Sequence, residues 1–331
     1  MKKILMFLVF LGGLSSLLLA FSVGIMITGE VGGNPIYEMM VSGAQQAHEK
    51  YAIEFKVVEA GVNAARWEPT LISLAATKLY DLVITFTEGM PSSVDRVASM
   101  FPDQKFALLD GIAPKRDNVF SLSFEDDQMA YLAGAFCGLV TLSSMEKANP
   151  QKIVGMIAGD SYPAMDNRIY PAFENGAKSI DPQIQVLFST VGSWADPKRG
   201  QDLANTMFEK GADILFPVAG GSGLGVLDEA LDEGKYMVGV DSNTISQATG
   251  TILGCALKRS DIAMEKVLEL ASQGKLPYGE SWTWGAKEDV VGFTLDDPEF
   301  IRLVPENIRQ HLQHVLDGLK DGSLDPLCPA S

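Results

Sequence analysis

The sequence predicts an α/β protein of two similar lobes, each built around a doubly wound parallel sheet. Five strand-like apolar runs of the first half recur in order in the second half. The first set starts at Val23, Glu54, Asp81, Lys105 and Val119, and the second at Ile153, Ile184, Asp213, Tyr236 and Thr251, so the offset between counterparts is nearly constant. Helix-like spacers between the runs indicate consecutive βα units. A ligand cleft is expected at the carboxyl ends of the strands.

Length and composition agree with two domains. The 331 residues are 47% hydrophobic, which is enough apolar material for two cores. The formal net charge of −16 argues against nucleic acid as a partner, because phosphate binding needs clustered Lys and Arg.

The N-terminus resembles a secretory signal. Lys2 and Lys3 precede an apolar run over residues 4–20, as in the n- and h-regions of a signal peptide. We expect a signal peptide at 1–22 with cleavage after Ser22, and therefore an exported, periplasmic protein. An uncleaved, membrane-tethering anchor is the alternative, although the run is slightly short for a span of about 20 apolar residues.

The first unit of each series has the same parts. A strand, a Gly-rich turn and a helix are expected at 23–28, 29–34 and 36–50, and again at 153–158, 159–163 and 166–179. The pairs Gly43-Ala44 and Gly176-Ala177 occupy matching places in the two helices. These matches favour duplication of one ancestral lobe.

Three crossings between the lobes are expected, near residues 121–127, 243–250 and 277–284. They divide the chain into lobe 1 at 23–123 plus 251–280, lobe 2 at 124–250 plus 281–325, and a tail at 326–331. The amphipathic helix near 305–319 belongs to the second lobe in this scheme. A hinge of several strands permits rigid-body closure around a ligand.

Residues for catalysis or metal binding are scarce. Only three His occur, and His311-x-x-His314 has no third ligand nearby, which favours a solvated helix face over a metal site. No GxSxG nucleophile motif occurs. Cys137, Cys255 and Cys328 form neither a CxxC pair nor a zinc pattern, and the first two are expected to be buried. The sequence predicts no catalytic residues, no metal and no cofactor.

A glycine-rich loop over residues 220–225 lies between a strand and a helix. Val226 breaks both the P-loop ending and the dinucleotide fingerprint. Gly220 and Gly221 instead offer close backbone approach and free N–H groups at a helix start, for ligand hydroxyls, carbonyls or anions. A turn that serves packing alone is the alternative.

Two charged residues follow strands of the second half. Asp241 ends the run 237–240, where its carboxylate could accept two hydrogen bonds from a vicinal diol. A helix cap is the alternative role. Lys258 follows the run 251–257 and could reach the same end of a ligand, or be an ordinary surface lysine.

Aromatic residues occur in corresponding loops of both halves: Tyr37, Trp67, Tyr162, Trp194 and, beside the glycine loop, Phe216. Flat rings that face across a cleft stack on a planar heterocycle. For each ring alone, core packing or loop anchoring is the alternative. For the set, we expect at least two to sandwich a ligand.

An ordered series of motifs resembles the basic membrane protein family, the solute-binding proteins of ABC transporters typified by purine nucleoside receptors. The motifs are the stretches 192–197, 211–213, 218–223 and 239–241, with further matches at 123–125, 131–134 and 257–258. The similarity covers essentially the whole mature chain. It implies a periplasmic-binding-protein type I fold, a nucleoside-like ligand, and delivery to a membrane permease with its ATPase.

The resemblance places Asp241 and Lys258 near the ribose, the Gly220-Gly221 turn against the ligand, and aromatic rings on the base. It departs from the family at residues 33–37, where Gly-Asn-Pro-Ile-Tyr replaces Asp-x-Ser-Phe-Asn, and at Asn243, which replaces a second acid. Asn34 and Tyr37 of this stretch stay as candidate ligand contacts.

Purine nucleoside and riboflavin are therefore both open as ligands. Some relatives of this family bind riboflavin, and Trp67, Tyr37 and Trp194 suit a wide flavin ring. Glu88 and Asp110 would then accept from ring or ribityl donors. A sugar-type or sensor-only binding protein, or an exported enzyme acting on nucleosides or sugars, are the alternatives.

Overall fold

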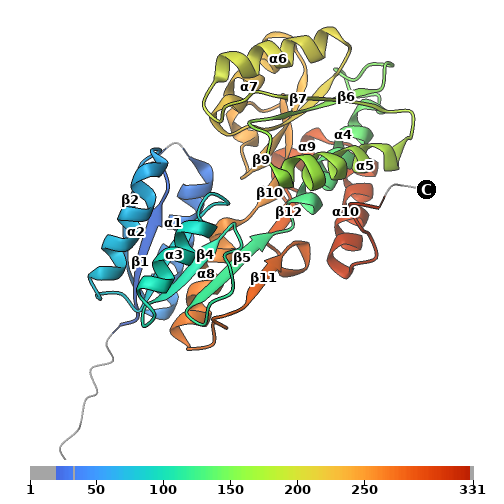
Figure 1. The fold of residues 1–331 in the computed structure, drawn as a ribbon. Coiled ribbons are helices and arrows are strands. Elements are labelled where there is room, and N and C mark those ends of the chain that lie inside the picture. The colour runs from blue at the N-terminus through green and yellow to red at the C-terminus, as the bar shows by residue number, and fades with distance from the viewer. Residues whose placement is uncertain (1–19, 33, 329–331) are drawn as a thin grey trace, which may run out of the picture.

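The computed structural model describes residues 20–32 and 34–328, which form two α/β lobes joined by a narrow waist (Figure 1). Each lobe has a six-stranded sheet with helices on both faces. This is the periplasmic-binding-protein type I fold that the resemblance of the sequence implied.

The first sheet has the order β11-β5-β4-β3-β1-β2, and all its neighbours are parallel. Its strands are β1 (Ser22–Ile27), β2 (Glu54–Glu59), β3 (Leu82–Phe86), β4 (Lys105–Leu109), β5 (Val119–Phe124) and β11 (Ser281–Trp284). Helices α1 (Pro35–Tyr51), α2 (Trp67–Ala76), α3 (Pro91–Met100) and α8 (Ser260–Ser272) belong to this lobe, with the short helix η1 (Ala64–Arg66).

The second sheet has the order β12-β10-β9-β8-β6-β7, with β12 antiparallel at its edge. Its strands are β6 (Ile153–Ala158), β7 (Gln185–Thr190), β8 (Ile214–Val218), β9 (Tyr236–Asp241), β10 (Ile252–Lys258) and β12 (Val291–Phe293). The helices are α4 (Asp126–Thr141), α5 (Tyr170–Ile180), α6 (Pro197–Glu209), α7 (Gly223–Asp232), α9 (Pro298–Leu303) and α10 (Glu306–Asp321), with the short helices η2 (Met165–Ile169), η3 (Gly220–Ser222), η4 (Ile245–Gln247) and η5 (Ala286–Glu288).

The sequence repeat is confirmed strand by strand. The order β5-β4-β3-β1-β2 of the first sheet is matched by β10-β9-β8-β6-β7 in the second. Helix packing repeats too, because α1 packs on α8 as α5 packs on α4. A Cβ at Gly43 would lie 2.2 Å from the carbonyl oxygen of Asp261, and one at Gly176 would lie 2.2 Å from that of Tyr131. Each glycine therefore permits one close helix crossing.

The predicted lobe boundaries are wrong at the second and third crossings between the lobes. Strand β10 pairs with β9 and β12 in the second sheet, whereas β11 pairs with β5 in the first. The connection from β9 to β10 is as short as that from β4 to β5 and contains no long helix, so β10 stays beside β9. The lobes are therefore 20–124 with 260–284, and 126–258 with 286–328.

Three segments cross the waist, near residues 124–126, 258–260 and 284–286, and hydrogen bonds tie the first to the third. The backbone N–H of Glu125 donates to the carbonyl of Trp284 at 2.9 Å. The N–H of Ala286 donates to the side-chain oxygen of Gln128 at 2.8 Å. The crossings therefore form one compact hinge.

The predicted signal segment lies almost wholly outside the described residues. Its predicted last residue, Ser22, is the first residue of β1. The N–H and the hydroxyl of Ser22 both donate to the Asp81 carboxylate at 2.8 Å. Among the helices of residues 20–32 and 34–328, none has the length and hydropathy of a membrane span. Cys137 and Cys255 are buried and unpaired, as expected, and Cys328 is exposed.

Candidate functional site

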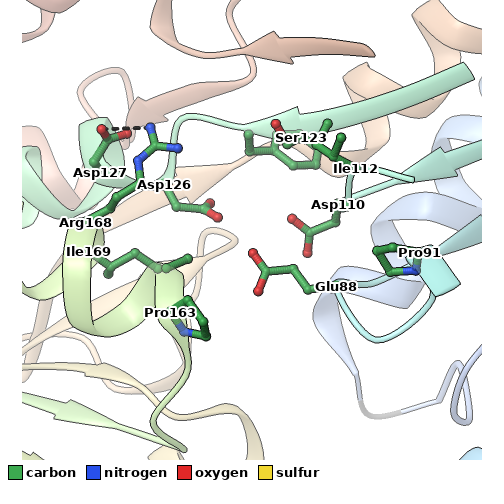
Figure 2. A pocket seen from close by; sticks show the side chains of 13 residues that line it. Glu88, Pro91, Asp110, Ile112, Ser123, Asp126, Asp127, Pro163, Arg168 and Ile169 are labelled. Atoms are coloured by element: carbon green, nitrogen blue, oxygen red, sulfur yellow. Dashed lines mark hydrogen bonds and ion pairs between the residues drawn. The ribbon is translucent and has the colours of Figure 1, made fainter. Parts of the chain in front are cut away.

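A cavity of about 420 Å³ lies between the lobes beside the hinge (Figure 2). The first lobe contributes residues from the ends of β3, β4 and β5, and the second contributes the start of α4 and the η2 turn. The lining residues are Glu88, Pro91, Asp110, Gly111, Ile112, Ser123, Phe124, Asp126, Asp127, Pro163, Ala164, Arg168 and Ile169. The predicted Glu88 and Asp110 are thus brought together at the expected sheet edge.

Lys258 connects the two lobes at this site. Its Nζ lies 2.7 Å from Asp110 Oδ1 and 3.2 Å from Asp126 Oδ1, and it lies over the Phe124 ring. The lysine is only 6% exposed, so it is not a surface residue. Burial alone would lower its pKa, but Asp110, Asp126 and Asp241 outweigh burial and raise the pKa well above its usual value. Lys258 is therefore a fixed positive charge.

The duplication explains the geometry of this charge network. Asp126 comes shortly after β5, and Lys258 is the last residue of β10. The two residues are separated by the same number of positions as these repeated strands, so they are equivalent in the duplication, and they meet at the hinge. Asp110 and Asp241 are likewise equivalent, since each comes at the end of the fourth strand of its series. Both have positive φ, at 58° and 66°. This backbone conformation is unfavourable for a residue with a Cβ and is often found at functional sites.

The acids Asp126, Asp241 and Glu88 have raised pKa values. Burial raises the pKa of Asp126 to about 6, while Lys258 lowers it and the neighbouring acids raise it further. Burial also raises the pKa of Asp241 to about 7, against the opposing effect of Lys258. For Glu88, burial and then the charge of Asp110 raise the pKa. Such shifts are typical of a site that is completed by a ligand.

Arg168 forms a second charged node, which the sequence analysis missed. Its guanidinium lies 2.6 Å from Glu125 Oε2 and 2.9 Å from Asp127 Oδ2. Figure 2 shows the ion pair with Asp127. Arg168 lies in the π-helical turn η2, a distortion that is frequent at functional sites. Pro171, which lacks a backbone N–H and so disrupts the helical bonding, was the sequence signal for this distortion.

A tryptophan occupies an equivalent place in each lobe. The Trp67 indole N–H donates to the Gly61 carbonyl at 2.7 Å, and a Cβ at Gly89 would lie 3.1 Å from its ring. In the second lobe, Trp194 covers Gly159 and Gly220 in the same manner. Trp194 is 42% exposed, so one ring face is free to contact a ligand.

Two tyrosines lie near the charged cluster. Tyr162 packs against Trp194 with ring centroids 6.1 Å apart. Burial chiefly raises its pKa, and the charges of Asp126, Lys258 and Glu88 also act on it. Tyr37 bonds the Thr28 hydroxyl at 2.9 Å, and burial chiefly raises its pKa.

Of the remaining predicted residues, Phe216 lies in the core, whereas Asn34 lies in a loop and Gly220 and Gly221 lie in the short helix η3. Phe216 is wrong as a ligand contact, because β8 is a buried central strand in which its ring is 0% exposed and stacks on Phe173. The side chain of Asn34 caps α1 by accepting from the N–H of Tyr37, whereas Gly33 lies outside the described residues. Gly220 and Gly221 are exposed, and they approach the carbonyl of Trp194 closely.

Comparison with known proteins identifies the family. The model for PnrA-like ABC transporter substrate-binding proteins matches residues 20–320. The chain belongs to this family. Its members bind a small-molecule solute for a membrane transporter and are not enzymes. The resemblance inferred from the sequence motifs is thereby confirmed.

Relatives and solved structures agree with this assignment. A CD4+ T-cell-stimulating antigen of Listeria monocytogenes is 28% identical over 75% of this chain and 72% of its own length. A protein of Lactococcus lactis described as the ABC transporter nucleoside-binding protein BmpA is 26% identical, over 71% and 69%. A solute-binding protein from Aeropyrum pernix has a TM-score of 0.80 at 20% identity and covers 92% of each chain, which shows the fold.

Proposed function

We propose that this protein is the extracytoplasmic receptor of an ABC importer, and that it captures a nucleoside-like ligand in the cleft between its lobes. The ligand class comprises purine nucleosides and riboflavin, which join a planar heterocycle to a hydroxylated ribose or ribityl chain. The single observation that carries the proposal is the interlobe cavity, at which carboxylates from both lobes and the hinge converge.

The polar groups suit the hydroxylated part of such a ligand. Asp110 and Asp126 have oxygens free to accept hydrogen bonds from hydroxyls, and Lys258 fixes both carboxylates in place. Asp241 is close enough for the charges of Lys258, Asp126 and Asp110 to act on its pKa. Lys258 bridges the second lobe to the first, so a ligand that bonds these acids contacts both lobes and favours the closed state.

The aromatic residues suit the planar part. On the second lobe, Trp194 packs against Tyr162, which directly precedes the lining residue Pro163. On the first lobe, Trp67 packs beside the Glu88-Gly89 turn. Stacking on an aromatic ring adds about 0.5–1.5 kcal/mol beyond the burial of area. The L. lactis relative described as nucleoside-binding supports this ligand class.

The same proposal includes the location and the partners. Export through the N-terminal signal would place the protein outside the cytoplasm, free or membrane-tethered, and several related proteins are described as lipoproteins. Its partners are then the permease and the ATPase of the importer.

A thermal-shift panel tests the proposal. Purine nucleosides, pyrimidine nucleosides, riboflavin and free sugars are each added to the purified protein, and hits are titrated by calorimetry. We expect a nucleoside or riboflavin to raise Tm and to be recovered chemically unchanged. Binding of free sugars only, or consumption of the ligand, would contradict the proposal.

A further inference from the structure

The cleft carries an excess of negative charge. Four carboxylates line it, those of Glu88, Asp110, Asp126 and Asp127. The carboxylates of Glu125 and Asp241 act on the same charged groups, whereas the cations are Lys258 and Arg168. Both cations are already engaged. Lys258 holds Asp110 and Asp126, and Arg168 holds Glu125 and Asp127.

Two carboxylates at the cavity lack full pairing. Among the described residues, none forms a hydrogen bond or an ion pair with the side chain of Glu88, which points into the space that Asp110 and Asp126 also face (Figure 2). The buried Oδ1 of Asp126 receives no hydrogen bond, although Lys258 Nζ lies 3.2 Å away, because the angle is unsuitable. The cavity therefore presents acceptors to its contents.

Closure of the cleft makes this excess costly. Water now solvates the carboxylates, and a closing lobe would remove it. Hydroxyls of a neutral ligand can donate to the carboxylates, but they leave the net charge in place. A cationic group both donates to the carboxylates and neutralises the excess charge.

We infer that the transported solute carries a protonated amine, which binds between Glu88 and Asp110 while Asp126 faces it from the hinge. This inference rests on the proposed function, since it narrows the ligand class from nucleoside-like to cationic and nucleoside-like. Glu88 is then the specificity-determining residue, because it is the carboxylate at the cavity without a partner of its own among the residues that the structure describes.

A cationic ligand determines whether binding becomes tighter or weaker as pH rises. The titratable groups that line the cavity are Glu88 after β3, Asp110 after β4, and Asp126 and Asp127 at the start of α4, beside Arg168. Lys258, Glu125, Tyr162 before η2 and Asp241 at the end of β9 interact electrostatically with these groups. A bound cation lowers the pKa values of the acids and so releases protons, which makes binding tighter as pH rises. For a neutral ligand, desolvation on closure raises those pKa values while hydrogen bonds from its hydroxyls lower them, so the dependence of affinity on pH is weaker.

Calorimetry with matched ligands tests the inference. The probes are adenosine, riboflavin, and the 2′-, 3′- and 5′-amino-deoxy analogues of adenosine, in which one hydroxyl becomes an amine. They are titrated at pH 5.5 and 7.5 into the wild type, into Glu88→Gln, and into the control Glu209→Gln. Glu209 is exposed at the C-terminal end of α6, the opposite end of that helix from the Trp194 loop.

We expect at least one amino analogue to bind tenfold or more tightly than adenosine, with higher affinity at pH 7.5 than at pH 5.5. Glu88→Gln should lose tenfold or more of that affinity, and Glu209→Gln should lose none. Adenosine or riboflavin binding as tightly as every amine overturns the inference but leaves the proposed function standing. If none of the probes binds, the proposed ligand class fails and this inference fails with it.

Discussion

Replacing Lys258 by Met removes the charge that holds the hinge acids while it keeps much of the side-chain volume. In the wild type, Nζ lies 2.7 Å from Asp110 and 3.2 Å from Asp126, with the lysine side chain 8% exposed. Removing one partner of a buried ion pair costs about 3–5 kcal/mol. The two aspartates retain 17% and 16% exposure, so water partly compensates and we expect a smaller loss than this range, about 2–3 kcal/mol, at pH 7.5.

The loss should depend on pH. The folded pKa of Asp126 is about 6, above that of an unfolded aspartate, so the folded state binds more protons and its stability falls as pH rises through that range. Without Lys258, which lowers this pKa, the folded value rises further. At pH 5.5 Asp126 is then protonated, and the cost of Lys258→Met should be smaller by about 1 kcal/mol than at pH 7.5.

Urea unfolding followed by tryptophan fluorescence at the two pH values measures both quantities. The control is Lys210→Met, at an exposed lysine at the end of α6, which should change stability little at either pH. A loss for Lys258→Met under about 0.5 kcal/mol, the scale of ordinary surface substitutions, or one that is equal at pH 5.5 and 7.5, would refute the reasoning about buried charge.

Three further predictions concern the ligand and the fold. Asp241→Ala should weaken binding of the identified ligand by about 1.5–3 kcal/mol, the range for hydrogen bonds to a charged group, and calorimetry showing unchanged affinity would remove Asp241 from the site. Trp194→Ala should abolish most of the change in tryptophan fluorescence on ligand binding and lower affinity by about 1 kcal/mol; an undiminished signal would locate the stacking elsewhere. Gly43→Ala should lower Tm strongly, since its Cβ would lie 2.2 Å from the Asp261 carbonyl, whereas Gly32→Ala, with open space around it, should be neutral; equal Tm values would contradict the close helix crossing.

The fold was predictable because strand spacing is a property of the sequence itself. The ten repeated strands and their order follow from a repeat whose offset is nearly constant along the chain. The error at β10 arose because the short connection between β9 and β10 is compatible both with a crossing to the other lobe and with pairing to the adjacent strand of the same sheet. The repeat itself held the correct answer, since β10 is the counterpart of β5, the neighbour of β4.

The site was predictable where a residue follows a strand, and less so elsewhere. Asp110 and Lys258 were found from their positions after strands, and the structure joins them. Phe216 failed because sequence position beside a glycine loop does not show whether a ring faces the core. Arg168 and Asp126 were missed as residues that line the cavity, because a helical turn and a hinge place them, and only the folded chain shows what they face.

Mass spectrometry of small molecules released from the natively purified protein tests the central claim most directly. The wild type should release a nucleoside-like compound in near-stoichiometric amount, and the double variant Asp110→Asn, Asp126→Asn should release much less. Recovery of the same compound in equal amount from the variant, or a wild type that releases nothing and binds none of the compounds in the panel, would contradict a solute site in the interlobe cleft.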